Sequence, residues 1–227
     1  MDCRDGKGWT ALHHAVQTDS EDCVRMLIRA GADINAVTSK SWDGTTPLRL
    51  AVFGSRNVLH LLLTTPGLRF DHAQSRSGNT VLHRLALEGL EDEARTLVQA
   101  GCDVGMLNKA GLTPLVLAMS AGHHGVVQLL LTTPAFKIDQ RDMTGDSYLH
   151  RAVEYRCITC LSLLLQQGCD TETRDGRGCT PLMATVAENW LEGCEALVQA
   201  GAVVSEESMR GTCVWDALLW LGLRWVV

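Results

Sequence analysis

The phrase GLTPLVLAM at residues 111–119 recurs along the chain and decides its architecture. Five variants of it are GWTALHHAV (8–16), GTTPLRLAV (44–52), GNTVLHRLA (78–86), GDSYLHRAV (145–153) and GCTPLMATV (178–186). The leucine that all six copies share stands at positions 12, 48, 82, 115, 149 and 182, so successive copies are 36, 34, 33, 34 and 33 residues apart. Self-similarity at a nearly constant period of this length is typical of repeat proteins, in which each unit buries its apolar face only against its neighbours.

Each phrase contains the signals that begin a helix. Most copies place a threonine where a helix needs an N-cap hydroxyl, and three of them place a proline at the first helical position, where a missing N–H is harmless. These pairs are Thr46-Pro47, Thr113-Pro114 and Thr180-Pro181. A second run follows, with leucine and valine at helical spacing, and in several copies it stops at a glycine. The pattern therefore predicts two short helices in every unit.

The phrase G-x-T-P-L-H-x-A and the ending L-L-x-x-G-A-D-x-N resemble the motifs of the ankyrin repeat family over residues 3–227. The resemblance implies an all-α fold, an ankyrin-repeat solenoid of stacked helix-turn-helix units with protruding β-hairpin fingers, and a single ankyrin repeat domain over residues 1–227. We expect its repeats near residues 3–36, 37–71, 72–105, 106–139, 140–172 and 173–205, with a partial seventh repeat at 206–227. It also implies that His13, His83 and His150 hydrogen-bond between neighbouring repeats.

Composition narrows the kinds of partner and the compartment. The net charge is −6 and no basic run exceeds two residues, which argues against binding to nucleic acid or to an anionic membrane surface. Nine cysteines and no secretory signal segment indicate free thiols and a cytoplasmic or nuclear protein. The apolar tail 213–227 contains Asp216 and Arg224 and is too short to span a bilayer.

The sequence contains no catalytic motif that we can identify. There is no G-x-S-x-G elbow, no H-E-x-x-H helix and no phosphate-binding lysine loop, so we predict no enzyme, no cofactor and no small-molecule substrate. Cys157 and Cys160 form a C-x-x-C pair, but no second pair completes four ligands. We interpret this pair, and the histidine pairs at 13–14 and 123–124, as structural, and expect no metal.

What remains is a binding surface for a partner protein or peptide in the concave groove that the resemblance implies. Candidate contact residues at the variable positions are Trp9, Trp42, Phe53, Leu87, Glu88, Leu112, Asp146, Glu154, Tyr155, Arg177 and Glu188. Aromatic residues dominate the first two repeats and acidic residues the later ones. We therefore expect a partner with an apolar anchor toward one end and basic residues toward the other. Alternatively, Trp9 and Trp42 pack one finger against the next.

Asn35 is a candidate site of modification. In LIRAGADIN, a leucine precedes Asn35 by eight residues and Asp33 precedes it by two. This resembles the pattern that a 2-oxoglutarate-dependent asparaginyl hydroxylase modifies in ankyrin domains. Alternatively, Asn35 is a hairpin residue that serves only the hydrogen bonds of its turn.

Two functional classes remain open. The first is a non-catalytic interaction module with an adaptor, scaffold or inhibitor role. Residues 31–52, GADINAVTSKSWDGTTPLRLAV, are faintly similar to the inhibitors of Rel-type transcription factors. The second class is a regulatory or substrate-targeting ankyrin domain of a larger enzyme or channel, with catalysis outside this chain. The unfinished seventh repeat favours a chain that continues beyond residue 227.

Overall fold

The computed structural model describes residues 3–39, 44–54, 56–70 and 76–204, and within these ranges it contains helices and turns but no strand. The chain divides into two compact units, Met1–Ala110 and Gly111–Val227. The helices of unit 1 are α1 (Ala11–Gln17), α2 (Glu21–Arg29), α3 (Pro47–Ala51), α4 (Arg56–Leu63), α5 (Val81–Glu88) and α6 (Glu91–Gln99). Those of unit 2 are α7 (Pro114–Ser120), α8 (His124–Leu131), α9 (Tyr148–Glu154), α10 (Ile158–Gln166), α11 (Pro181–Ala187) and α12 (Leu191–Gln199).

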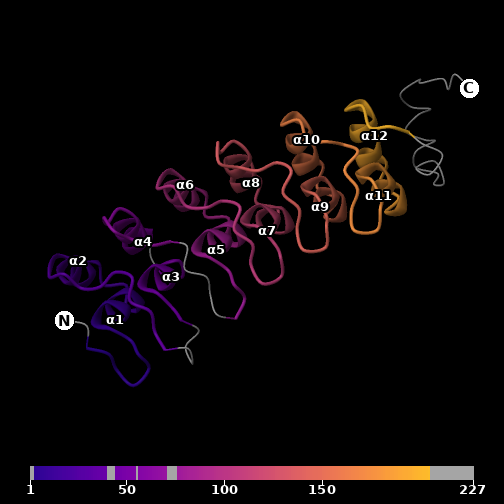
Figure 1. Ribbon diagram of the computed structural model, residues 1–227. Coiled ribbons are helices and arrows are strands. Elements are labelled where there is room, and N and C mark those ends of the chain that lie inside the picture. Colours follow the sequence, from indigo (N-terminus) through magenta and orange to yellow (C-terminus); the bar gives the residue numbers. More distant parts are fainter. Residues whose placement is uncertain (1–2, 40–43, 55, 71–75, 205–227) are drawn as a thin grey trace, which may run out of the picture. The chain divides into compact units, whose positions relative to one another are not determined.

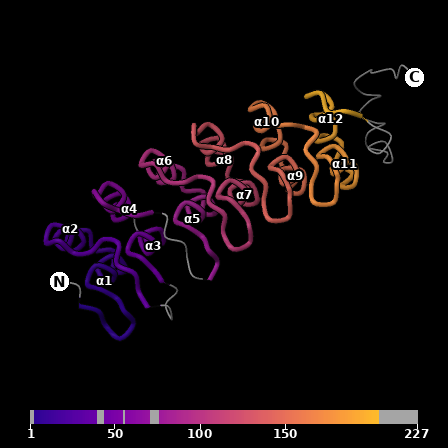
Figure 2. The backbone as a smooth tube through the Cα atoms, in the orientation of Figure 1, coloured from indigo at the N-terminus to yellow at the C-terminus, as the bar shows by residue number. Residues whose placement is uncertain are grey.

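Within each unit the helices form two rows. In unit 1, helices α1, α3 and α5 form one row, and helices α2, α4 and α6 form the other (Figure 1). In unit 2 the rows are α7, α9 and α11, and α8, α10 and α12, as the backbone trace also shows (Figure 2). We call the odd-numbered helices the inner row and the even-numbered helices the outer row. Each helix packs on its partner within a pair, and neighbouring pairs pack on one another.

The repeated leucine forms the core of both stacks. Leu12, Leu48 and Leu82 in unit 1, and Leu115, Leu149 and Leu182 in unit 2, are each at most 2% exposed. The predicted helix starts are confirmed, since Pro47, Pro114 and Pro181 occupy the first turn of their helices. The hydroxyl of Thr180, for example, accepts a hydrogen bond from the backbone N–H of Met183 at 3.3 Å.

The predicted histidine bridges are observed for His13 and His150. Nδ1 of His13 accepts from the N–H of Thr10 at 3.2 Å, and its Nε2 lies 3.2 Å from the carbonyl oxygen of Thr45 in the next repeat. A carbonyl only accepts, so Nε2 carries the proton of a neutral ring. His150 makes the same bridge to the carbonyl of Cys179, at 3.0 Å. Burial lowers the pKa of His13, in keeping with this neutral form.

The connections before the inner helices are turns. Where β-hairpin fingers were expected, the described segments contain no strand. Instead, backbone hydrogen bonds between residues close in sequence hold these turns. The N–H of Asp142 donates to the carbonyl of Asp146 at 3.1 Å, and the N–H of Asp175 donates to the carbonyl of Cys179 at 2.9 Å. The expected partial seventh repeat lies outside the described residues. None of the helices in the described part of the chain is long and apolar enough to cross a bilayer.

Candidate partner-binding site

Trp9 is not the exposed anchor that we expected from the sequence. Only 6% of its surface is exposed, and its ring centroid lies 5.1 Å from that of His14 and 5.8 Å from that of His13. The turn that carries it contacts the next repeat, because the N–H of Ser39 donates to the carbonyl of Lys7 at 3.3 Å. Trp9 is therefore buried against α1 of its own repeat, and packing of its ring against the next finger stays a prediction. Trp42 lies outside the described residues.

Phe53, by contrast, is 61% exposed in the turn that follows α3. The guanidinium carbon of Arg84, on α5, lies 4.6 Å from the centre of the Phe53 ring. The same guanidinium pairs with Glu88 at 2.8 Å, so the charge of this predicted contact residue is partly neutralised. The sequence did not indicate Arg84, which holds Phe53 and Glu88 in one surface cluster. Leu87, also predicted, is half-buried.

The predicted acidic residues of unit 2 converge on one cavity of about 260 Å³ between α9 and α11. Four predicted contact residues line it, namely Asp146, Glu154, Arg177 and Glu188. Further lining residues are Asp175, Arg151, His150 and Met183. Its four carboxylates outnumber its two guanidinium groups, so the cavity carries a net negative charge. Leu112 and Tyr155, which are half-buried, are not among its lining residues.

Arg151 organises this cavity and was not singled out from the sequence. It lies 2.5 Å from Asp142, 3.1 Å from Asp146 and 2.5 Å from Glu154. The Thr144 hydroxyl also contacts both aspartates and accepts from Arg151 at 2.9 Å. Three carboxylates share one guanidinium, so the group retains excess negative charge at its exposed member, Glu154.

Burial and hydrogen bonding set the ionisation of this group. Burial alone raises the pKa of Asp142, but hydrogen bonds from Thr144 and Arg151 outweigh it and hold the pKa below its ordinary value. Burial opposes the charge of Arg151, yet its bonds to Glu154 and Asp142 raise its pKa overall. Both partners are therefore charged at neutral pH.

Asn35 uses its whole side-chain amide to join two repeats. Its Nδ2 donates to the carbonyl of Gly67 at 2.9 Å, and its Oδ1 accepts from the N–H of Arg69 at 2.7 Å. Its own N–H donates to Asp33 at 2.9 Å. The side chain therefore joins neighbouring repeats and only the backbone N–H serves the turn, so Asn35 does more than the turn role that the sequence left open as the alternative. Hydroxylation stays a prediction. A mass shift absent from peptides that contain Asn35, after co-expression with the hydroxylase, would contradict it.

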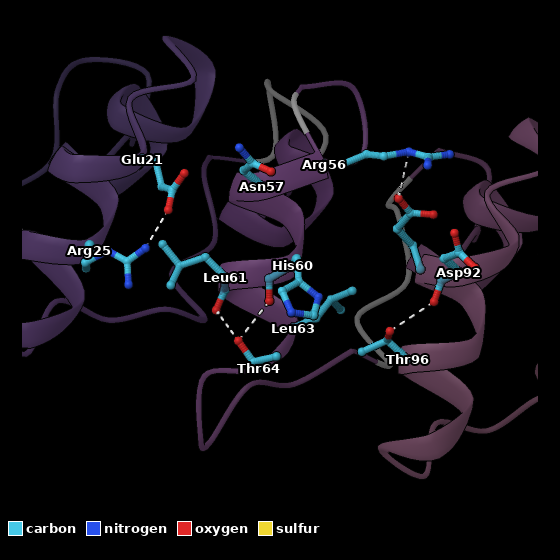
Figure 3. A pocket seen from close by; sticks show the side chains of 11 residues that line it. Glu21, Arg25, Arg56, Asn57, His60, Leu61, Leu63, Thr64, Asp92 and Thr96 are labelled. Atoms are coloured by element: carbon cyan, nitrogen blue, oxygen red, sulfur yellow. Dashed lines mark hydrogen bonds and ion pairs between the residues drawn. The ribbon is translucent and has the colours of Figure 1, made fainter.

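A second cavity, of about 600 Å³, lies on the outer helices α2, α4 and α6 of unit 1 (Figure 3). Glu21 pairs with Arg25 at 2.5 Å, and Arg56 pairs with Glu93 at 3.1 Å, so several of its charges are neutralised within the chain. None of the predicted contact residues lines this cavity. It gives the partner hypothesis no support.

Comparison with known proteins fits this architecture. A family model described as ankyrin repeats (3 copies) matches residues 1–74 and 82–175, which is well over half of the chain. The chain belongs to the ankyrin repeat family. Its fold is an all-helical ankyrin repeat solenoid, and proteins of this family are generally non-catalytic interaction modules.

Two individual proteins and one solved structure are similar to this chain. B-cell lymphoma 3 protein homolog of Mus musculus is 42% identical over 121 residues, which are 53% of this chain and 26% of that protein. Ankyrin repeat and SOCS box protein 16 of Homo sapiens is 32% identical over 192 residues, or 80% of this chain and 41% of that protein. The crystal structure of the ankyrin repeat domain of Bcl-3, a unique member of the IkappaB protein family, aligns with a TM-score of 0.82 at 27% identity. It covers 94% of this chain and 99% of that one.

The chain spans between about a quarter and two fifths of the length of these two curated relatives. It aligns with nearly the whole ankyrin repeat domain of Bcl-3, and ankyrin repeats generally mediate binding to partner proteins.

Proposed function

We propose that the inner row of unit 2 binds a basic segment of a partner protein, and that the chain acts by this binding rather than by catalysis. The observation that carries the proposal is the cavity between α9 and α11, which gathers four predicted contact residues and a net negative charge. A partner lysine or arginine side chain fits such a site because the cavity offers more carboxylates than the chain itself neutralises.

Glu154 and Glu188 are the groups on which the proposal depends most. Their side chains are 54% and 53% exposed, so they are accessible to a partner. Glu154 pairs with Arg151, and Glu188 lies 3.6 Å from Arg156, whose guanidinium also donates to the Glu188 carbonyl. The Glu188–Arg156 pair is half exposed on both sides and is worth at most about 1 kcal/mol, so a partner cation can compete for Glu188. The carboxylate of Glu154 lies at the exposed end of its pair with the mostly buried Arg151.

Phe53 is the proposed apolar contact of unit 1. Singly exposed hydrophobic residues are common, but an exposed aromatic beneath a guanidinium presents a rigid apolar face for a partner side chain. Trp9 has no part in this proposal because it is buried.

Peptide arrays test the proposal. A set of peptides graded in lysine and arginine content is presented to the wild-type chain and to the Glu154→Gln/Glu188→Gln variant. We expect the wild type to select basic peptides with affinities that fall as salt rises, and the variant to lose roughly tenfold in affinity, or about 1.4 kcal/mol. A Glu192→Gln/Glu195→Gln variant, with both changes on α12, serves as the matched control. Equal binding by wild type and the first variant would refute the proposal.

A second candidate is a regulatory or substrate-targeting module of a larger enzyme or channel. It is favoured by similarity to a transient receptor potential cation channel subfamily A member 1 homolog of Caenorhabditis elegans (28% identical over 72% of this chain) and to tyrosine-protein kinase HTK16 of Hydra vulgaris (26% identical over 68% of this chain). In that case the same cavity binds a segment of the longer protein or of its substrate. A segment that is covalently attached to the chain occupies the cavity at high effective concentration, so a separate basic peptide should bind the longer protein more weakly.

A further inference from the structure

Two thiols and an imidazole from neighbouring repeats converge in unit 2. Cys157 is the N-cap residue of α10, Cys160 lies in its first turn, and His124 is the first residue of α8. Sγ of Cys157 lies 2.6 Å from Sγ of Cys160. Nδ1 of His124 lies 3.9 Å from the first sulfur and 3.8 Å from the second. All three potential ligand atoms lie within 4.8 Å of one another.

Repeat stacking explains this convergence. Outer helices α8 and α10 pack side by side, and His124 precedes Cys157 by 33 residues, which is one repeat period. Cys157 and Cys160 are three residues apart at a helix start, so both thiols face the same side of α10. In the sequence analysis the cysteine pair and the histidine pair at 123–124 were weighed separately, and the repeat period places His124 beside the cysteines.

The donor set and its dimensions suit zinc. Two cysteine sulfurs and one imidazole nitrogen are the ligands that Zn²⁺ prefers. Tetrahedral zinc places sulfur and nitrogen about 3.5 Å apart and two sulfurs about 3.8 Å apart. The two sulfur–nitrogen distances are already close to this value. The sulfurs must separate by about 1.2 Å to reach the tetrahedral spacing.

The surroundings leave one coordination position open. His124 and Cys157 line a shallow depression of about 420 Å³, together with Tyr155 and Arg156, whereas Cys160 is buried. A water molecule can therefore reach an ion held by the three side chains. The backbone N–H of Cys160 donates to Sγ of Cys157 at 3.2 Å, so this sulfur is oriented at the start of α10 beside the second thiol.

We propose that His124, Cys157 and Cys160 bind one Zn²⁺ ion, with water as the fourth ligand, and that the ion cross-links the fourth and fifth repeats. Bound zinc then stabilises the native state of unit 2, because the unfolded chain does not hold the three ligands together.

Cobalt substitution tests the site on the full chain. Reduced, metal-free protein is titrated with Co²⁺, and the thiolate-to-cobalt charge-transfer absorption is followed before displacement by Zn²⁺. We expect one ion per chain and a higher melting temperature with zinc. Cys157→Ser and Cys160→Ser should abolish the band, and Cys157→Ser retains an N-cap oxygen for the helix. His124→Asn should weaken affinity by at least about tenfold, since the loss of even a second-shell partner costs about 10–100-fold.

Matched controls separate this site from the other seven cysteines. His123→Asn changes the neighbouring histidine, and Cys23→Ser removes an exposed thiol of unit 1. Both should bind cobalt as the wild type does, and circular dichroism checks that every variant is folded. The proposal is overturned if the wild type gives no band, if the band survives in Cys157→Ser or Cys160→Ser, or if mass spectrometry shows that the reduced pair forms a disulfide in place of binding metal.

Discussion

Replacing Arg151 by methionine should destabilise unit 2 strongly. The side chain of Arg151 is 13% exposed and that of Asp142 is 4% exposed, and the variant leaves the buried Asp142 and the half-buried Asp146 without this cation. Loss of one partner from a buried pair costs about 3–5 kcal/mol, whereas an exposed pair is worth about 0.2–1 kcal/mol. This group is mostly buried with one exposed member, so we expect a loss of roughly 2–4 kcal/mol in the free energy of unfolding at pH 7.

The assay is urea unfolding at pH 7, followed by circular dichroism, with Arg156→Met as the matched control. Arg156 and Glu188 are both about half exposed and 3.6 Å apart, so the control should lose less than about 1 kcal/mol. A second variant, Arg151→Met with Asp142→Asn, should recover part of the loss because the amide needs no cation. Equal destabilisation by the two methionine variants would refute the reasoning.

The pH dependence follows from the lowered pKa of Asp142. Its stabilising contribution in the wild type is complete above the ordinary value of 3.8 and is lost as the pH falls through the still lower pKa of the folded state. Without Arg151, the folded-state pKa of Asp142 rises, and protonation removes the uncompensated charge at a higher pH. The stability difference between wild type and Arg151→Met should therefore shrink from pH 7 to pH 4. A difference that grows on acidification would contradict the assignment.

Three further changes have expected outcomes that unfolding measurements check. Leu130→Ala should cost about 2–5 kcal/mol because Leu130 is fully buried, whereas Leu191→Ala, at a residue 41% exposed, should cost far less. Similar losses of unfolding free energy in Leu130→Ala and Leu191→Ala would contradict the expectation that burial sets the cost. Gly193→Ala should cost about 1–3 kcal/mol, because the new Cβ meets the Trp190 ring at 2.2 Å, and a neutral result would show that this ring moves freely. Asn35→Ala should cost about 1–3 kcal/mol through its lost bonds to the next repeat, and an unchanged melting temperature would exclude that role.

Local signals in the sequence determined the helical framework. The shared leucine, the threonine caps and the prolines act within one repeat and recur in each, so six copies reinforce one interpretation. The resemblance to ankyrin repeats also implied the histidine bridges, which His13 and His150 make between equivalent positions of adjacent repeats. Glu154 and Glu188 lie at variable positions of the inner row, and the period places them around the same cavity.

Tertiary structure alone decided which side chains are accessible and how they pair. Trp9 and Phe53 are both aromatic residues at variable positions. Trp9 is buried, in a finger that hydrogen-bonds to the next repeat, whereas Phe53 is exposed. Arg84 interacts with the Phe53 ring and with Glu88. Arg151 pairs with carboxylates that come from both the preceding turn and its own helix. His124 meets Cys157 and Cys160 because neighbouring outer helices pack side by side. A repeat period specifies which residues become neighbours, but burial, pairing and metal-ligand geometry depend on rotamers and on the surface that each neighbour covers.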